Sequence, residues 1–217
     1  MPWASLRFAE IWTTFRSYFG LGREARPERI DSPEALARFL DTRASFVAQT
    51  SLYGYLRTRA GMRYPELFDD AAFVESINIA KWHVWLDCLS DLAVFAGSRL
   101  AQQAPREMPR VASMIVDVVD GVLAQTGTPA EAGGEFAAHA ERVRNRIART
   151  DWLVIGNDEA AFTESPAGLV HWAPVMDELK QLDEEIVRNS VRFRWQQVRR
   201  DFVQFLDLEA MLGTVAP

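Results

Sequence analysis

The chain has 217 residues, of which 48% are hydrophobic and 11% aromatic, so it can bury a core of ordinary domain size. Its formal net charge of −6 argues against a nucleic-acid-binding protein, because phosphate contacts usually require a clustered basic surface. The single cysteine, Cys88, cannot form an internal disulfide, and its apolar surroundings predict a buried thiol in a reducing compartment. No apolar run reaches the ~18 residues that a membrane span needs. We therefore expect a cytoplasmic protein without a nucleic-acid partner.

Residues 3–21, WASLRFAEIWTTFRSYFGL, predict an amphipathic helix with an aromatic face. At ~100° per residue, that face includes Phe8, Trp12, Phe15 and Phe19. Such a helix can pack on its own domain, contact a partner subunit or lie in a membrane interface, which would place the protein at the inner membrane. The glycine- and arginine-rich loop that follows predicts a boundary between an N-terminal helix with its linker, residues 1–29, and a helical domain, residues 30–217.

Two long helices are predicted next. Ser32, followed by a proline, is a suitable N-cap, and apolar residues then recur at helical spacing as far as Gly61. After the segment MRYPELFDD, either Asp69 or Asp70 can cap a second helix that runs to about Gln103.

The rest of the chain also predicts helices. They run from Pro105 or Pro109 to the segment QTGTP, from Pro129 to about Arg149, and from about Trp172 to Leu206, with a short extended piece at residues 152–155. Strand signals are almost absent, since no hairpin dipeptide joins alternating apolar runs. The predicted fold class is all-α, a bundle of six or seven helices.

The stretch FVESINIAKWHVWLDCLSD, residues 73–91, places polar groups on a strongly apolar helix. On a helical wheel, Glu75 falls in the same apolar stripe as Trp82, and Asn78 lies at its edge. A second apolar row on the far side predicts a central helix. A buried Glu75 would need a positive partner, because unpaired burial of a carboxylate costs several kcal/mol. The candidate partners are Arg57, Arg59 and Arg63.

His83 and Asp87 stand one turn apart on this helix, with Ser90 nearby. The His83 and Asp87 pair can orient an imidazole for general-base catalysis, supply two metal ligands, or make only a packing contact. Together with Ser90, these two residues are the candidate catalytic groups. The chain lacks the Glu-x-x-His pairs of di-iron bundles, a G-x-S-x-G elbow and a glycine-rich phosphate loop. We therefore predict no cofactor and no metal, with a site built on the three histidines as the minor alternative.

Tyrosines and arginines lie close together in the stretch SLYGYLRTRAGMRYPELF. Combined with the helix above, they give a candidate binding site for a small anionic or hydrophobic ligand. The candidate residues are Tyr53, Tyr55, Arg57, Arg59, Arg63, Glu75, Asn78 and Trp82. A network of internal ion pairs is the alternative interpretation.

The block FVAQTSLYGYLRTRAGMRYPELFDDAAFVESINIAKWHVWLDCLSDLAVF, residues 46–95, resembles a family of small, uncharacterised bacterial proteins, some of which are catalogued as esterases. The resemblance is best in this block and fades in the C-terminal half. It implies a bacterial, cytosolic, helical protein, and it carries over no catalytic residue.

These observations predict a non-enzymatic binding or assembly protein that forms a homodimer. The first alternative is a hydrolase in which His83 is the base, Asp87 orients it, and Arg59 or Arg63 holds an anionic substrate. The second alternative is a protein that binds a membrane surface through the aromatic N-terminal helix.

Overall fold

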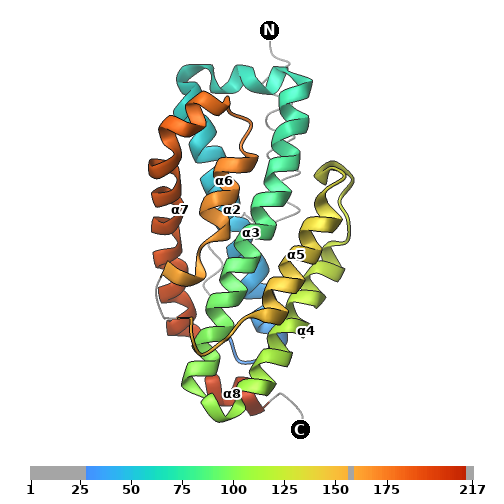
Figure 1. Cartoon of the computed structure of the whole chain (residues 1–217), viewed down its shortest axis with the longest axis vertical. Coiled ribbons are helices and arrows are strands. Elements are labelled where there is room, and N and C mark those ends of the chain that lie inside the picture. The colour runs from blue at the N-terminus through green and yellow to red at the C-terminus, as the bar shows by residue number, and fades with distance from the viewer. Residues whose placement is uncertain (1–27, 156–158, 214–217) are drawn as a thin grey trace.

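The computed structural model describes residues 28–155 and 159–213, which form a bundle of seven α-helices (Figure 1). The helices are α2 (Pro33–Ala60), α3 (Ala71–Gln103), α4 (Met108–Thr126), α5 (Phe136–Arg149), α6 (Glu164–Trp172), α7 (Asp177–Phe205) and α8 (Leu208–Gly213). Within these ranges no strand is present, and an isolated parallel bridge joins Ile30 to Leu206. The all-α prediction is confirmed. The predicted N-terminal helix, with Phe8, Trp12, Phe15 and Phe19, lies outside the described residues.

Helices α2 and α3 begin and end where their capping residues predict. The Ser32 side chain accepts a hydrogen bond from the Ala35 N–H at 3.2 Å, and α2 ends at Gly61 with a positive φ of 56°. Asp70 is the N-cap of α3, since its Oδ1 accepts from the Ala72 N–H at 2.9 Å. A nine-residue 3-10 segment, Gly61–Asp69, joins the two helices.

Helix α3 is the central element of the bundle, as its two apolar rows predict. Every residue from Ala80 to Ser98 is buried, because α2, α4, α5 and α6 all pack around this helix (Figure 1). Cys88 is fully buried within it, which confirms the expectation for the thiol.

The second half of the chain departs from the prediction at three points. The helix predicted from Pro129 begins at Phe136, because Gly133, with φ 76°, interrupts the chain after a short 3-10 turn. Residues 152–155 form a turn instead of an extended piece. The helix predicted from about Trp172 begins at Asp177 as α7, since Pro174 disfavours a helical conformation at the preceding residue, and α6, Glu164–Trp172, lies in a segment for which no helix is predicted.

Candidate functional site

Three buried side chains form a continuous hydrogen-bonded chain between α3 and α5. The Nδ1 atoms of His83 and His139 are 2.8 Å apart, and His139 Nε2 is 2.9 Å from Asp87 Oδ1. His83 Nε2 lies 3.2 Å from the carbonyl oxygen of Ala132. Asp87 therefore contacts His139 and not His83, so the predicted His83–Asp87 pair on one helix is not formed.

The positions of the protons in this network follow from its donors and acceptors. The Ala132 carbonyl can only accept, so His83 carries its proton on Nε2. A neutral His83 then accepts from the Nδ1–H of His139, which leaves one proton to be shared between His139 Nε2 and Asp87 Oδ1. Burial lowers the pKa of His83 to about 4, which keeps this imidazole neutral.

Asp87 lies at the end of this network, where burial favours the neutral form of its carboxyl group. Burial is the main influence on its pKa and raises it. Its second oxygen, Oδ2, is buried and has no hydrogen-bond partner in the described residues. A buried, unpartnered oxygen costs less free energy on a neutral carboxyl than on a carboxylate.

The network is closed to solvent by α6. The Trp172 ring stacks on the His83 ring with centroids 3.7 Å apart and an interplanar angle of 16°. His83 is 0% exposed, and both of its ring nitrogens are engaged by protein atoms. A general base needs to reach the proton that it removes, so this geometry argues against the hydrolase alternative.

A second buried network joins α3 to the start of α6. Asp91 is 0% exposed and accepts hydrogen bonds from the Ser165 N–H at 2.7 Å, the Ser165 hydroxyl at 2.6 Å and the Glu164 N–H at 3.1 Å. Arg146 of α5 pairs with the same carboxylate at 2.7 Å. Asp91 thus caps α6 from another helix, and burial raises its pKa to about 6 despite these partners.

Ser90, the third candidate catalytic residue, belongs to this second network. Its hydroxyl accepts a hydrogen bond from Arg146 at 2.9 Å and is buried. The ring nitrogens of His83 bind His139 and the Ala132 carbonyl, and Asp87 binds His139, so the three candidate catalytic residues do not converge on one reacting position.

The polar residues near the start of α3 form a third contact, with the 3-10 turn Ala130–Ala132. Lys81 Nζ lies 2.8 Å from Glu131 Oε1, and Trp82 donates to the same oxygen at 3.4 Å. The hydrogen bond from Lys81 lowers the pKa of Glu131. Asn78 is half-buried beside Lys81, with 3.5 Å between Asn78 Oδ1 and Lys81 Nζ.

The prediction that Glu75 points into the apolar stripe is wrong. Glu75 is exposed, as are Ala71 and Ala72, because the first turns of α3 extend beyond the helices that cover its middle. The arginines proposed as its partners have other contacts: Arg59 pairs with Asp183, and Arg63 pairs with Glu66.

The predicted tyrosine and arginine cluster is divided between different surfaces. The Tyr55 hydroxyl donates to Asp183 of α7 at 3.0 Å, and Arg59 binds the same carboxylate through a second hydrogen bond at 2.6 Å. Arg57 and Arg63 are exposed on α2 and the following 3-10 segment. Tyr53 is half-buried, and burial is the main cause of its raised pKa. These groups form an α2–α7 ion pair and separate surface contacts, and they do not surround a common ligand position.

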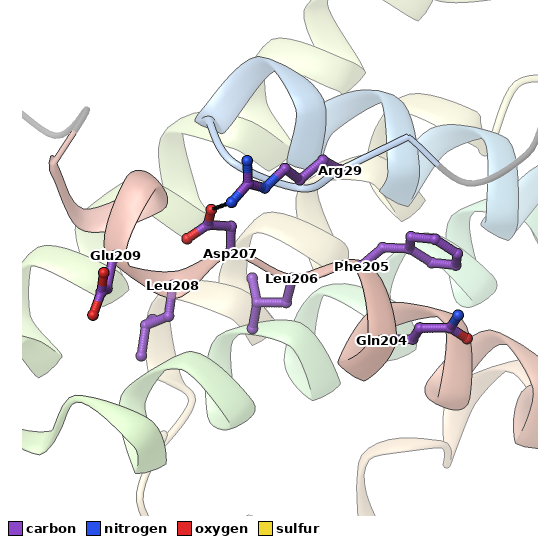
Figure 2. Close-up of a pocket in the computed structure, with 7 residues that line it drawn as sticks. All are labelled: Arg29, Gln204, Phe205, Leu206, Asp207, Leu208 and Glu209. Carbon is purple, nitrogen blue, oxygen red and sulfur yellow. Dashed lines mark ion pairs between the residues drawn. The ribbon is translucent and has the colours of Figure 1, made fainter.

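A surface pocket of about 550 Å³ lies where the N-terminal side of α2 meets the end of α7 and the start of α8 (Figure 2). Its lining residues are Arg29, Gln204, Phe205, Leu206, Asp207, Leu208 and Glu209. Arg29 already forms an ion pair with Asp207, so the strongest anion-binding group in the pocket is neutralised within the chain.

Helix α7 carries an exposed apolar stripe that the sequence analysis did not single out. Leu182, Ile186 and Phe193 are 76%, 74% and 70% exposed, and their spacing of four and seven residues places them on one side of the helix. Figure 1 shows α7 at one edge of the bundle. The opposite side of α7 is buried through Val187 and Trp195, so the helix is apolar on two sides.

Comparisons with known proteins give no assignment: no family model, no curated protein and no solved structure matches the chain. Among the helices of the described residues, none combines the length and apolar character needed to cross a bilayer. In the same part of the chain, no group of three or more histidine, cysteine or acidic side chains is arranged to hold a metal ion.

Proposed function

We propose that this protein is a non-enzymatic assembly protein that pairs with a second copy of itself through the outer face of α7. The observation that carries the proposal is the exposed stripe of Leu182, Ile186 and Phe193. The buried polar networks around His83 and Asp91 link α3 to α5 and α6. The His83 and Asp91 side chains are shielded from solvent, which favours a structural role for both networks.

The second apolar side of α7 supports the presence of a partner. A helix that is apolar on two sides is usually packed on both, and within residues 28–155 and 159–213 the side of Val187 and Trp195 is covered while the stripe is exposed. Burying an exposed aromatic or aliphatic side chain contributes about 1.5–3 kcal/mol, so three such residues on each of two copies provide a substantial driving force. Several large apolar side chains exposed on one side of a helix are typical of a protein-protein contact.

A second copy is the favoured partner because α7 is charged in a self-complementary way. Its first half, residues 177–187, is acidic, and its second half, residues 188–205, is basic. Each half can therefore meet the opposite charge on another α7.

The test is the mass of the full chain in solution, measured by light scattering after size-exclusion chromatography. We expect a dimer for the natural chain and a monomer for the double variant Ile186→Ser with Phe193→Ser. Met62→Ser is the matched control, since Met62 is 98% exposed on the 3-10 segment Gly61–Asp69 and should leave the dimer unchanged. Far-UV circular dichroism checks that each variant is folded. A natural chain that stays monomeric at about 100 μM overturns the proposal.

A second pair of variants separates this surface from the N-terminal segment. Trp12→Ser with Phe15→Ser, made in the full chain, removes two aromatic residues of the predicted amphipathic helix. If this variant is monomeric while Ile186→Ser with Phe193→Ser remains a dimer, dimerisation belongs to the N-terminal segment and not to α7. We expect the reverse result.

A further inference from the structure

The two halves of α7 carry opposite net charges of equal size. Residues 177–187 contain five acidic residues and one lysine, a net charge of −4. Residues 188–205 contain five arginines and one aspartate, a net charge of +4. The change of sign falls between Val187 and Arg188, close to the middle of the exposed stripe.

We infer that two copies pair with their α7 helices antiparallel and with the twofold axis near the boundary between residues 187 and 188. This inference rests on the proposed function and adds the orientation and register of the contact. Asp183 is paired with Arg59 and Glu184 with Arg188, so the acidic groups left for a partner beside the stripe are Glu178 and Glu185. A parallel pair would bring these acidic groups near those of the partner, whereas an antiparallel pair sets them against the basic half.

The apolar stripe fits the same register. With the axis at that boundary, Leu182 is level with Phe193 of the partner subunit, and the reciprocal contact follows by symmetry. The two copies of Ile186 then lie about 4.5 Å apart along the helix direction, on either side of the axis. All three residues of the stripe are thereby used in both copies. A register centred elsewhere leaves at least one of these contacts unmatched.

Charged residues beside the stripe also become complementary. Glu185 lies within two residues of the level of Arg192 of the partner subunit. On a helical wheel, positions 185 and 192 fall roughly 60° and 80° to the same side of Leu182. The twofold axis places this side of the stripe in one copy next to the same side in the other copy. Glu185 of each copy therefore faces Arg192 of the partner subunit. Such an isologous contact closes on itself, so it gives a dimer and not a filament.

Cysteine cross-linking tests the orientation directly. Glu178 and Gln196 are exposed, carry no part of the stripe, and both lie roughly 40° to the same side of Leu182. In the antiparallel dimer, position 178 is nearly level with position 196 of the other copy, so a mixture of Glu178→Cys and Gln196→Cys chains should form disulfide-linked dimers. Each variant alone should not, because equivalent positions are about 25 Å or more apart along the helix, against the ~7 Å limit for a disulfide. The natural Cys88 is fully buried and does not interfere.

Charge reversal provides a second test in the same dimer. Glu185→Arg should raise the dimer dissociation constant about tenfold, since the contact between Glu185 and Arg192 of the partner subunit is lost twice in the symmetric dimer. Adding Arg192→Glu to the same chain should restore the affinity. Glu209→Arg on α8 is the control and should have no effect, because α8 lies away from the contact.

The outcomes separate this inference from the proposed function. A monomeric natural chain overturns both. A dimer in which Glu178→Cys or Gln196→Cys cross-links efficiently on its own has parallel helices, which overturns the orientation and leaves α7 as the contact. A dimer that gives no cross-link with either variant or their mixture is held by another surface and overturns both.

Discussion

Asp87 and Gly168 are in such close contact that a side chain at position 168 would overlap the carboxyl group. A Cβ atom added to Gly168 would stand 1.8 Å from Asp87 Oδ2 and 2.7 Å from its Cγ. The absent side chain lets the backbone of α6 press against α3. This close packing shields Asp87 from water and places Trp172, one turn further along α6, over the ring of His83.

We expect Gly168→Ala to destabilise the fold by about 2–4 kcal/mol, because α6 must move away from α3 to make room for the methyl group. Urea unfolding followed by circular dichroism measures the change in the free energy of unfolding. Gly121→Ala is the matched control, since a Cβ at this position in α4 meets no atom within 4 Å. It should raise stability by about 0.5–1 kcal/mol, as expected for alanine in place of glycine within a helix. Equal effects of the two substitutions would contradict the close contact.

The parts of the fold that the sequence predicts are those with local signals. Ser32 and Gly61 mark helix ends through their own backbone or side-chain chemistry, and both positions are correct, while Asp70 is one of the two N-caps predicted for α3. The central position of α3 follows from apolar residues on two sides of the same helix. Signals of this kind depend on neighbours within a few residues, so no knowledge of the tertiary structure is required.

The parts that the sequence misses depend on distant residues. Asp87 has its partner His139 on α5, 52 positions away, so the one-turn spacing of His83 and Asp87 does not predict this contact. Asp91 caps α6 from a different helix, while the side chain of the N-cap residue Thr163 makes no capping hydrogen bond. Glu75 has the periodicity of a buried residue, but the helices that would cover it end before reaching it. Leu182, Ile186 and Phe193 recur at helical spacing in the sequence, but periodicity alone cannot tell an outward apolar face from an inward one.

Replacing Asp91 should affect stability more than any other single carboxylate described above. Asp91→Ala removes the cap of α6 and leaves the Arg146 guanidinium without its buried partner, for an expected loss of about 3–5 kcal/mol. The free energy of unfolding in urea gives this value. Asp183→Asn is the comparison, because its ion pair with Arg59 is at the surface and should contribute far less. A small effect of Asp91→Ala would mean that α6 is held in place without this network.

The buried histidine should make stability depend on acid pH. The pKa of His83 is lowered to about 4, mainly by burial, against about 6.5 in an unfolded chain. The unfolded chain therefore binds more protons between these values, so the stability from a neutral His83 is present above about pH 6.5 and lost as the pH falls through about 4. Asp91 acts in the opposite sense, because its pKa is raised to about 6 and proton binding therefore favours the folded chain. The stability that comes from this proton binding is present below about pH 4 and lost as the pH rises through 6, whereas the hydrogen bonds and ion pair of Asp91 are a separate contribution.

Comparison with His83→Gln isolates the histidine contribution. Glutamine can still donate to the Ala132 carbonyl but does not titrate. At each pH, the quantity of interest is the free energy of unfolding of the natural chain minus that of the variant. This difference should be about 2 kcal/mol larger near pH 7.5 than near pH 4.5. Urea midpoints at the two pH values give the difference. A constant difference across the range would show that His83 does not change protonation between the folded and unfolded chains.

The thiol of Cys88 should be unreactive in the folded protein. It is fully buried in α3, and burial raises its pKa well above the ordinary value, so the reactive thiolate is scarce. We expect Ellman's reagent to leave the native chain unmodified and to label one thiol per chain in guanidinium chloride. Met62→Cys is the positive control, because Met62 is 98% exposed and lies outside the α7 contact, so its added thiol should react at once, with Cys88 following only on unfolding. Rapid, complete labelling of the native natural chain would show that α3 opens to solvent far more readily than its packing implies.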